Sequence, residues 1–264
     1  MSDRGTEASR RDGAAHTLLV ALLVSLVCSA LVATAAVQLR PRQLKNEAVN
    51  KQRNILQVVD LLEEGKSIEE LFKQVDAKVV ELASGTYVED IDAAEYDQHE
   101  AAKDPALSVP IPKELDIANI GRRATLANVY LVRDSGDEVQ QIILPVYGPG
   151  LWSTMYGFIA LEPDANTVVG LQFYEHEETP GLGDQVDNTQ WRRLWRGKNI
   201  YNELGEPAIE VIRGKVTDAT GSQHQVDGLS GATLTGRGVT NLLRYWLGEH
   251  GFRPYLERVG EGEG

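Results

Sequence analysis

The sequence predicts an α+β domain that follows a single membrane-spanning helix. Three observations lead to this prediction: one long uncharged apolar run near the N-terminus, several β-rich runs joined by turn signals, and helical patterns kept apart from those strands. Because strands and helices do not alternate, we expect a mainly antiparallel sheet with flanking helices. At 264 residues the chain is long enough for an anchor and one domain of ordinary size.

Residues 17–39 form the apolar run, which carries no charge and consists mostly of Leu, Val and Ala. As a helix this run spans roughly 30 Å, enough to cross the hydrocarbon core of a bilayer. We therefore predict a transmembrane helix at 17–39 and a cytoplasmic tail at 1–16. The alternative is a cleaved secretory signal, with Arg10 and Arg11 as its basic region, as in a twin-arginine signal, and Ala-Thr-Ala at 33–35 as its cleavage site. The length of the run favours the anchor.

The charges on either side of the apolar run bear on orientation. Basic residues lie on both sides of it: Arg4, Arg10 and Arg11 before, and Arg40, Arg42, Lys45, Lys51 and Arg53 after. A literal positive-inside count would leave the large domain in the cytoplasm. Long domains translocate regardless of such counts, so the flanking charges do not decide the side.

Residues 40–127 are predicted to form a juxtamembrane helix and the N-terminal part of an extracytoplasmic domain. Apolar residues recur at helical spacing from 43 to 64, and Ser67 opens a capping-box sequence that predicts a short helix through Gln74. The acidic, proline-containing stretch at 90–112 is expected to be a surface loop.

The domain core is predicted at 128–250, with a C-terminal tail at 251–264. Patterns of β-rich or helical residues separated by turn signals place its elements as follows: strands at 128–133, 138–147, 156–161, 167–174 and 208–216, and helices at 187–196 and 236–247, with two further short strands upstream at 77–83 and 86–89. Consecutive strands around short turns predict antiparallel hairpins.

Composition restricts the classes of function. The net charge of −13, with acidic residues concentrated at 81–104, argues against a nucleic-acid partner, since phosphate backbones are bound by excess Lys and Arg. The single cysteine, Cys28, lies in the apolar run, so we expect no intrachain disulfide and no cysteine-based metal site or cluster. Any redox centre must then be an organic cofactor or be held by other residues.

The sequence Ser-Gly-Ala-Thr-Leu-Thr at 230–235 opens the last helical pattern. Thr235 is expected at or beside the helix N-cap, where its hydroxyl has unpaired backbone N–H groups and the positive end of the helix dipole next to it. A phosphate on that hydroxyl would be held there without further machinery. The simpler interpretation is that Thr235 only caps the helix.

Two other stretches have features of a binding site. Residues 148–158, Gly-Pro-Gly-Leu-Trp-Ser-Thr-Met-Tyr-Gly-Phe, combine glycines that permit close backbone approach with Trp152, which can cover an aromatic ring or belong to the core. Residues 178–183, Glu-Thr-Pro-Gly-Leu-Gly, predict a type II turn at Pro180 and Gly181. Each stretch alone is equally typical of ordinary structure.

Together, and in this order, the three stretches resemble the FMN-binding domain family, in which FMN is joined through its phosphate to the last threonine of an S-G-A-T-x-T motif. With the single anchor, they resemble the membrane-anchored C subunits of Na+-translocating NADH:quinone oxidoreductases. The resemblance implies covalent FMN on Thr235 and flavin-binding residues on all three stretches: Trp152, Glu178, Thr179, Leu182, Gly183, Ser230, Gly231, Ala232, Thr233 and Leu234. One departure is Gly236, where many members of the family carry Ser or Thr.

The resemblance also implies a function. It is that of a single-pass subunit in the bacterial inner membrane, with its domain on the periplasmic side, that relays electrons from NADH toward quinone in a complex that exports sodium. No evident general base accompanies Thr235 in the sequence, so it is not expected to attach flavin unaided. The resemblance implies a separate flavin transferase that uses FAD and a divalent metal. The other subunits of the complex and membrane lipid are the remaining expected partners, and the isolated chain, with no catalytic residues of its own, is expected to be an electron carrier.

Other interpretations apply to the same residues. The related G subunit of Rnf ion-translocating complexes is the alternative within the family, and a non-redox anchored binding module is the alternative outside it. His176 stands without a second histidine at ligand spacing and is expected to be an exposed polar turn residue. A hydrolytic triad of His224 and Asp227 with a serine lacks the Gly-x-Ser-x-Gly elbow that would present the nucleophile.

Overall fold

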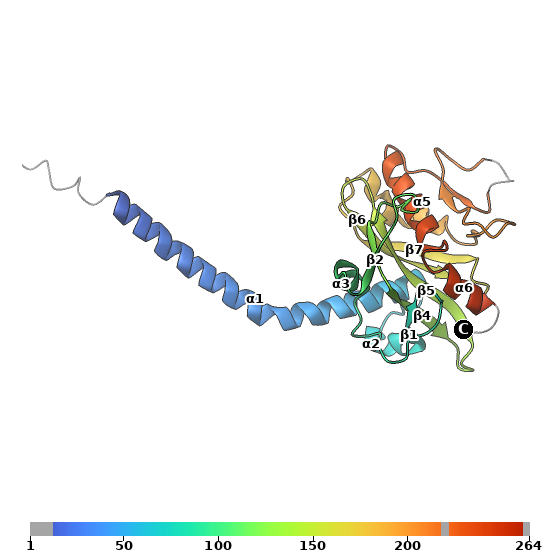
Figure 1. The fold of residues 1–264 in the computed structure, drawn as a ribbon, viewed down its shortest axis with the longest axis horizontal. Helices are drawn as coiled ribbons and strands as arrows, with labels where there is room; N and C mark the ends of the chain where they lie inside the picture. Colours follow the sequence, from blue (N-terminus) through green and yellow to red (C-terminus); the bar gives the residue numbers. More distant parts are fainter. Residues whose placement is uncertain (1–12, 218–221, 261–264) are drawn as a thin grey trace, which may run out of the picture. The chain divides into compact units, whose positions relative to one another are not determined.

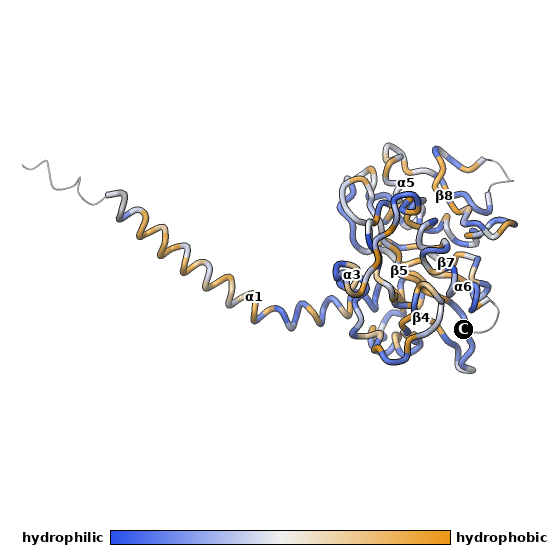
Figure 2. The backbone as a smooth tube through the Cα atoms, viewed as in Figure 1, coloured by the Kyte–Doolittle hydropathy of each residue, from blue (hydrophilic) through white to orange (hydrophobic). Residues whose placement is uncertain are grey.

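A computed structural model describes residues 13–217 and 222–260 (Figure 1). The chain comprises two units, Met1–Lys51 and Gln52–Gly264. The first consists, in its described part, of most of helix α1, Ala14–Val58. Large apolar side chains from Leu18 to Leu39 are exposed on it, and Figure 2 shows this run as a hydrophobic stretch. Among the described residues, α1 is the helix long and apolar enough to cross a membrane.

The predicted transmembrane and juxtamembrane helices belong to one helix in the structure, since α1 contains both the apolar run and most of the charged segment after it. Pro41 lies inside α1, where the missing N–H removes one backbone hydrogen bond. The boundaries predicted at residues 16, 39, 127 and 250 are functional divisions, which the secondary structure does not test, and they stay predictions.

The second unit is built on a five-stranded antiparallel sheet in the order β1-β4-β5-β6-β7. Its strands are β1 Val75–Glu81, β4 Leu126–Arg133, β5 Val139–Pro149, β6 Thr154–Leu161 and β7 Val168–Glu175. The predicted hairpin turn after β4 forms, with the Asp137 N–H donating to the Asp134 carbonyl at 3.1 Å and Asp137 at φ 67°. The α+β class with a mainly antiparallel sheet is thereby confirmed.

Both faces of the sheet are covered by apolar side chains. Strand β5 shows the alternation: Ile142 and Leu144 lie in one buried cluster, whereas Ile143 lies in the other. The first cluster includes the C-terminal helices, and the second receives Ile55 and Leu56 from the end of α1. This two-sided burial explains why the strands have apolar runs with little polar alternation.

Shorter elements surround the sheet. In chain order they are α2 Ile68–Leu71, the 3-10 helix η2 Phe72–Gln74, α3 Gln98–Lys103, β2 Ser108–Pro110, β3 Arg122–Ala124, the 3-10 helix η3 Gly183–Asp187, α4 Thr189–Arg193, β8 Glu210–Val211, β9 Gln225–Val226, α5 Thr233–Trp246 and α6 Arg253–Gly260. The predicted cap of α2 is present, with the Ser67 hydroxyl oxygen accepting from the Glu70 N–H at 3.2 Å.

The predicted surface loop at 90–112 instead contains α3 and β2. Asp97 caps α3 by accepting from the His99 and Glu100 N–H groups, and buried Gln98 accepts from the Asn128 N–H on β4. The acidic residues thus include a helix cap, which their charge alone did not indicate.

Three C-terminal predictions also differ from the structure. The strand expected at 208–216 is reduced to β8, which pairs in parallel with β9, and the helix expected at 187–196 is η3 followed by the short α4. The expected tail at 251–264 contains α6, whose Tyr255 and Leu256 are buried in the core. Tyr255 and Leu256 lie one helical turn after Phe252. These three apolar residues are too few to distinguish a helix from an irregular tail by their spacing.

Candidate functional site

Thr235 lies in the first turn of α5, as its third residue, and is fully buried. The N-cap position belongs to Ala232, which offers no side-chain hydrogen bond, so the hydroxyl of Thr235 does not cap the helix. The chain enters α5 through Gly231 at φ 74°, a left-handed conformation that suits glycine. The hydroxyl instead contacts Glu178, from the 178–183 stretch.

The carboxylate of Glu178 connects the three stretches that resemble the FMN-binding family, residues 148–158, 178–183 and 230–235. Its Oε2 accepts a hydrogen bond from the Thr235 hydroxyl, and its Oε1 accepts from the N–H groups of Leu151 at 2.8 Å and Trp152 at 3.2 Å. Glu178 is only 4% exposed. A buried carboxylate is costly without donors, and here donors from both partner stretches meet it. A buried carboxylate thus lies next to the Thr235 hydroxyl, a neighbour that the sequence did not indicate.

Two glycines make room for this carboxylate. A Cβ on Gly150 would lie 2.3 Å from Glu178 Oε1. A Cβ on Gly183 would lie 2.6 Å from Glu178 Oε2 and 2.9 Å from Thr235 Oγ1. Any side chain at either position would displace the carboxylate from the hydroxyl, so the glycines in these two stretches are explained by the contact they surround.

The turn between Thr179 and Leu182 has the predicted features. The Leu182 N–H donates to the Thr179 carbonyl at 3.1 Å, and Gly181 has a φ of 77°. The Thr179 hydroxyl oxygen accepts from the indole N–H of Trp152 at 2.8 Å. Trp152 is 67% exposed, so it is not a core residue, and its ring stands beside the turn.

Exposed apolar side chains flank the buried pair of Glu178 and Thr235 in sequence. They come from all three stretches: Leu151, Trp152, Leu182 and Leu234. Large apolar groups that are exposed on a protein surface are typical of sites that receive a ligand or partner. A planar aromatic ring is the kind of ligand that such side chains would cover.

His176 was expected to be an exposed turn residue, but its side chain is only 11% exposed. Its Nδ1 accepts from the Glu178 N–H at 3.2 Å, and its Nε2 lies 2.9 Å from Asp187 Oδ2. Since Nδ1 accepts, Nε2 carries the proton of the neutral imidazole and donates to Asp187. His176 thereby orients the backbone of Glu178. The sequence signal is a histidine two residues before the glutamate, which has no meaning without the fold.

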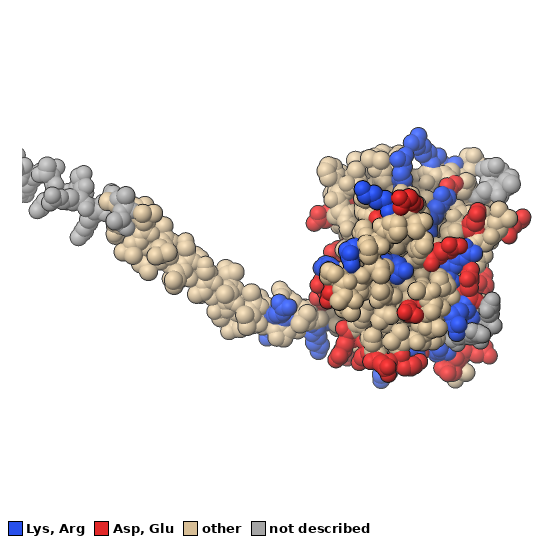
Figure 3. Space-filling model, in the orientation of Figure 1, with Lys and Arg blue, Asp and Glu red and all other residues tan. Residues whose placement is uncertain are grey.

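A cleft of about 710 Å³ opens beside the 230–235 stretch, within the size range of ligand sites. Its lining joins this stretch to β8 and the loop after it, and includes Ser230, Gly231, Thr233, Gly236, Arg237, Val211, Arg213, Lys215 and Arg244. Figure 3 shows several basic side chains over the upper part of the second unit, with acidic side chains among them. Glycine suits position 236, because a Cβ there would lie 3.1 Å from Val211 Cγ1.

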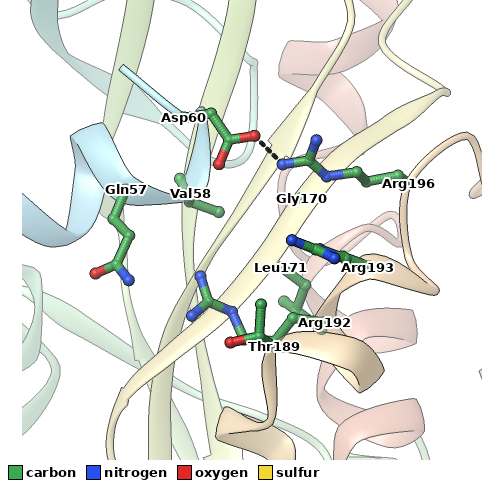
Figure 4. Close-up of a pocket in the computed structure, with 9 residues that line it drawn as sticks. All are labelled: Gln57, Val58, Asp60, Gly170, Leu171, Thr189, Arg192, Arg193 and Arg196. Carbon is green, nitrogen blue, oxygen red and sulfur yellow. Dashed lines mark hydrogen bonds and ion pairs between the residues drawn. The ribbon is translucent and has the colours of Figure 1, made fainter. Parts of the chain in front are cut away.

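A second pocket, of about 210 Å³, is lined by arginines and contains none of the predicted site residues (Figure 4). Arg192 donates to Gln172 Oε1 at 2.7 Å, and Gln172 in turn donates to Gln57 Oε1 at 3.1 Å. Arg196 pairs with Asp60. Burial lowers the pKa of Arg192. These contacts tie the end of α1 to β7, so the pocket has a structural explanation.

Several of the predicted site residues thus lie close to the Glu178 carboxylate. The contacts of Glu178, Thr179, Gly183 and Thr235 show this. Leu182 also approaches the motif, because a Cβ on Gly231 would lie 2.8 Å from Leu182 Cδ2. Ser230, Gly231 and Thr233 face the cleft instead. Leu234 is exposed and Ala232 is buried.

A comparison with known protein families gives the class of protein to which the chain belongs. Residues 150–248 match the FMN-binding domain family, and this segment contains the Glu178–Thr235 contact together with Leu151 and Trp152. The chain is therefore an FMN-binding domain protein whose second unit follows one long apolar helix.

Full-length relatives narrow the class. The chain is 49% identical to the C subunit of the Na+-translocating NADH-quinone reductase of Pseudomonas aeruginosa, over 97% of this chain and 99% of that protein, and 48% identical, with the same coverage, to its counterpart from Vibrio alginolyticus. The crystal structure of Shewanella oneidensis NqrC superposes with a TM-score of 0.77 at 36% identity, over 82% of this chain and 99% of that one. The chain belongs to the family of C subunits of Na+-translocating NADH-quinone reductases.

Proposed function

We propose that the chain is the FMN-carrying electron-transfer subunit of a Na+-translocating NADH-quinone reductase. Family membership over nearly the whole chain supports this function, as does the FMN-binding domain match. The alternative of an Rnf G subunit is not favoured, because the full-length relatives described above are C subunits. Bound FMN would supply the redox chemistry, and the protein would supply its position and surroundings.

The observation that carries the proposal is the convergence of three distant stretches on the carboxylate of Glu178, which accepts from the Thr235 hydroxyl. We place the FMN on this oxygen, joined through its phosphate. The residues fit such a group: the oxygen lies in the first turn of α5, where the helix dipole favours an anion, and Arg237 lines the adjoining cleft. A phosphodiester carries one negative charge, which these groups can balance. Trp152, Leu182 and Leu234 would cover the ring.

The subunit would span the inner membrane once through α1, with the remaining chain on the periplasmic side. The length and hydropathy of α1 support the single span, and the family resemblance supports the side. The other subunits of the reductase would be its partners, and a separate flavin transferase would load it. A covalent bond suits a cofactor working outside the cytoplasm, where lost FMN could not be readily replaced.

The test of this function is to locate flavin on the chain. Full-length protein expressed with a flavin transferase should fluoresce as flavin on a denaturing gel, and peptide mass spectrometry should place one FMN on Thr235. Thr235→Ala should abolish the fluorescent band. The matched control is Thr233→Ala, which alters an exposed residue two positions away and should leave a fluorescent band. Covalent flavin on the Thr235→Ala protein would refute the assignment.

A further inference from the structure

We propose that Glu178 is the general base for flavin attachment, so that the chain itself supplies the group that removes the proton from Thr235. The inference rests on the proposed attachment of FMN at Thr235. A threonine hydroxyl is a poor nucleophile until a base takes its proton, and an adjacent side chain within hydrogen-bond reach is the usual solution. Glu178 meets that geometric requirement, because the Thr235 hydroxyl already donates to its Oε2.

The carboxylate is held in the orientation that this role needs. Two backbone N–H groups, of Leu151 and Trp152, bind Oε1 and leave Oε2 on the hydroxyl. His176 fixes the backbone of Glu178 from the other side. Both donors to Oε1 are backbone groups that need not be recruited during the reaction, so the base is preorganised by the fold.

The same contact explains why one hydroxyl of the motif is chosen. Ser230 and Thr233 are exposed and line the cleft, where a transferase would reach them more easily than buried Thr235. If access decided the site, either would be preferred. The described contacts of Glu178 place its carboxylate on Thr235, so the presence of a base, and not exposure, selects the modified residue.

Flavin attachment exchanges one bond between phosphorus and oxygen for another. Oγ1 of Thr235 attacks the phosphorus of the FMN half of a flavin adenine dinucleotide delivered by the transferase. The new Oγ1–P bond forms as the bond from that phosphorus to the oxygen of the adenylate half breaks, and AMP leaves. The hydroxyl proton passes along the existing hydrogen bond to Glu178 Oε2. No atom changes oxidation state.

The proton on Glu178 also removes the repulsion between two negative charges in the product. The diester on Thr235 is a monoanion placed beside a buried carboxylate, and two adjacent negative charges in a buried site disfavour each other. A protonated Glu178 is neutral and can donate its O–H to a diester oxygen. The group that accepts the proton in the reaction thus becomes a hydrogen-bond donor to the product.

The experiment measures the initial rate of flavin attachment to full-length apo-protein in detergent, with purified flavin transferase, FAD and Mg²⁺. Attached flavin is read by gel fluorescence and intact mass. Glu178→Gln keeps the shape of the side chain and removes the base, and should slow attachment by at least about 100-fold.

The matched control is Glu177→Gln, which removes the same charge one residue away from an exposed side chain. Its rate should stay within about twofold of wild type, so a larger loss there would assign the effect to overall charge. Glu178→Asp keeps a carboxylate but draws it back from the hydroxyl, so it should attach flavin more slowly than wild type and faster than the Gln variant. If thermal unfolding shows that the Gln variant is unfolded, the Asp variant decides the question, because attachment by folded Glu178→Asp at the full wild-type rate would contradict the role of the base.

Attachment by folded Glu178→Gln within about threefold of the wild-type rate would overturn the inference and leave the proposed function intact. A different result, wild-type protein with no flavin on Thr235, would instead remove the proposed function. The two failures are therefore distinguishable in one set of samples.

Discussion

Gly183→Ala tests the geometry of the site most directly, because the added methyl group has no free space. Its Cβ would stand 2.6 Å from Glu178 Oε2 and 2.9 Å from Thr235 Oγ1, so one of the two groups must move. Losing a buried hydrogen bond to a charged group costs about 1.5–3 kcal/mol, and overpacking adds about 1–3 kcal/mol. Since the two effects partly relieve each other, we expect a net loss of about 2–4 kcal/mol.

For a unit of this size, that loss lowers the melting temperature by about 5–15 °C. Thermal unfolding of the full-length apo-protein in detergent, followed by near-ultraviolet circular dichroism, measures it. Gly181→Ala is the control: its φ of 77° makes alanine cost about 1–2 kcal/mol, but its Cβ would meet nothing within 4 Å. A melting temperature for Gly183→Ala equal to that of wild type would show that the Glu178–Thr235 contact is not formed as described.

Three further predictions concern the ring, the reaction and the membrane. Trp152→Ala should change the fluorescence and absorption of attached flavin while leaving the apo-protein's melting temperature within about 3 °C of wild type, because the side chain is 67% exposed; unchanged flavin spectra would remove Trp152 from the site. Stopped-flow mixing of the flavinylated, isolated chain with NADH should show no rapid bleaching, since the sequence has no Gly-x-Gly-x-x-Gly dinucleotide motif; rapid bleaching would make the chain a self-sufficient dehydrogenase. Protease added to spheroplasts should digest the domain while undigested protein still begins near Met1; protection would support the positive-inside count, and an N-terminus at residue 36 or 37 would establish signal cleavage.

The sequence predicted those parts of the fold that are specified locally. The hairpin at Asp134–Asp137 and the cap at Ser67 depend on residues within four positions of one another, and both are present. Helix α6 was missed because its stability comes from burying Tyr255 and Leu256 in a core assembled from distant strands. Tertiary packing of this kind leaves little trace in a short helical pattern.

The site was predictable as three separate motifs but not as a chemical arrangement. Glu178 and Thr235 are 57 positions apart, so no spacing rule connects the carboxylate with the hydroxyl. The resemblance placed Glu178 near the flavin, but only the fold shows that its carboxylate accepts a hydrogen bond from the Thr235 hydroxyl. For the same reason His176 was assigned to solvent, although its partners are a backbone N–H two residues away and Asp187.

The complete burial of Thr235 has a kinetic consequence for maturation. A transferase reaches the hydroxyl only in open molecules, in which covering residues have moved away while Glu178 keeps its contact, so the observed rate is the intrinsic rate multiplied by the fraction of open molecules. Every additional amount of about 1.4 kcal/mol in the free energy of opening lowers that fraction tenfold. Substitutions that stabilise the covered state would therefore yield a more stable protein that receives its cofactor more slowly.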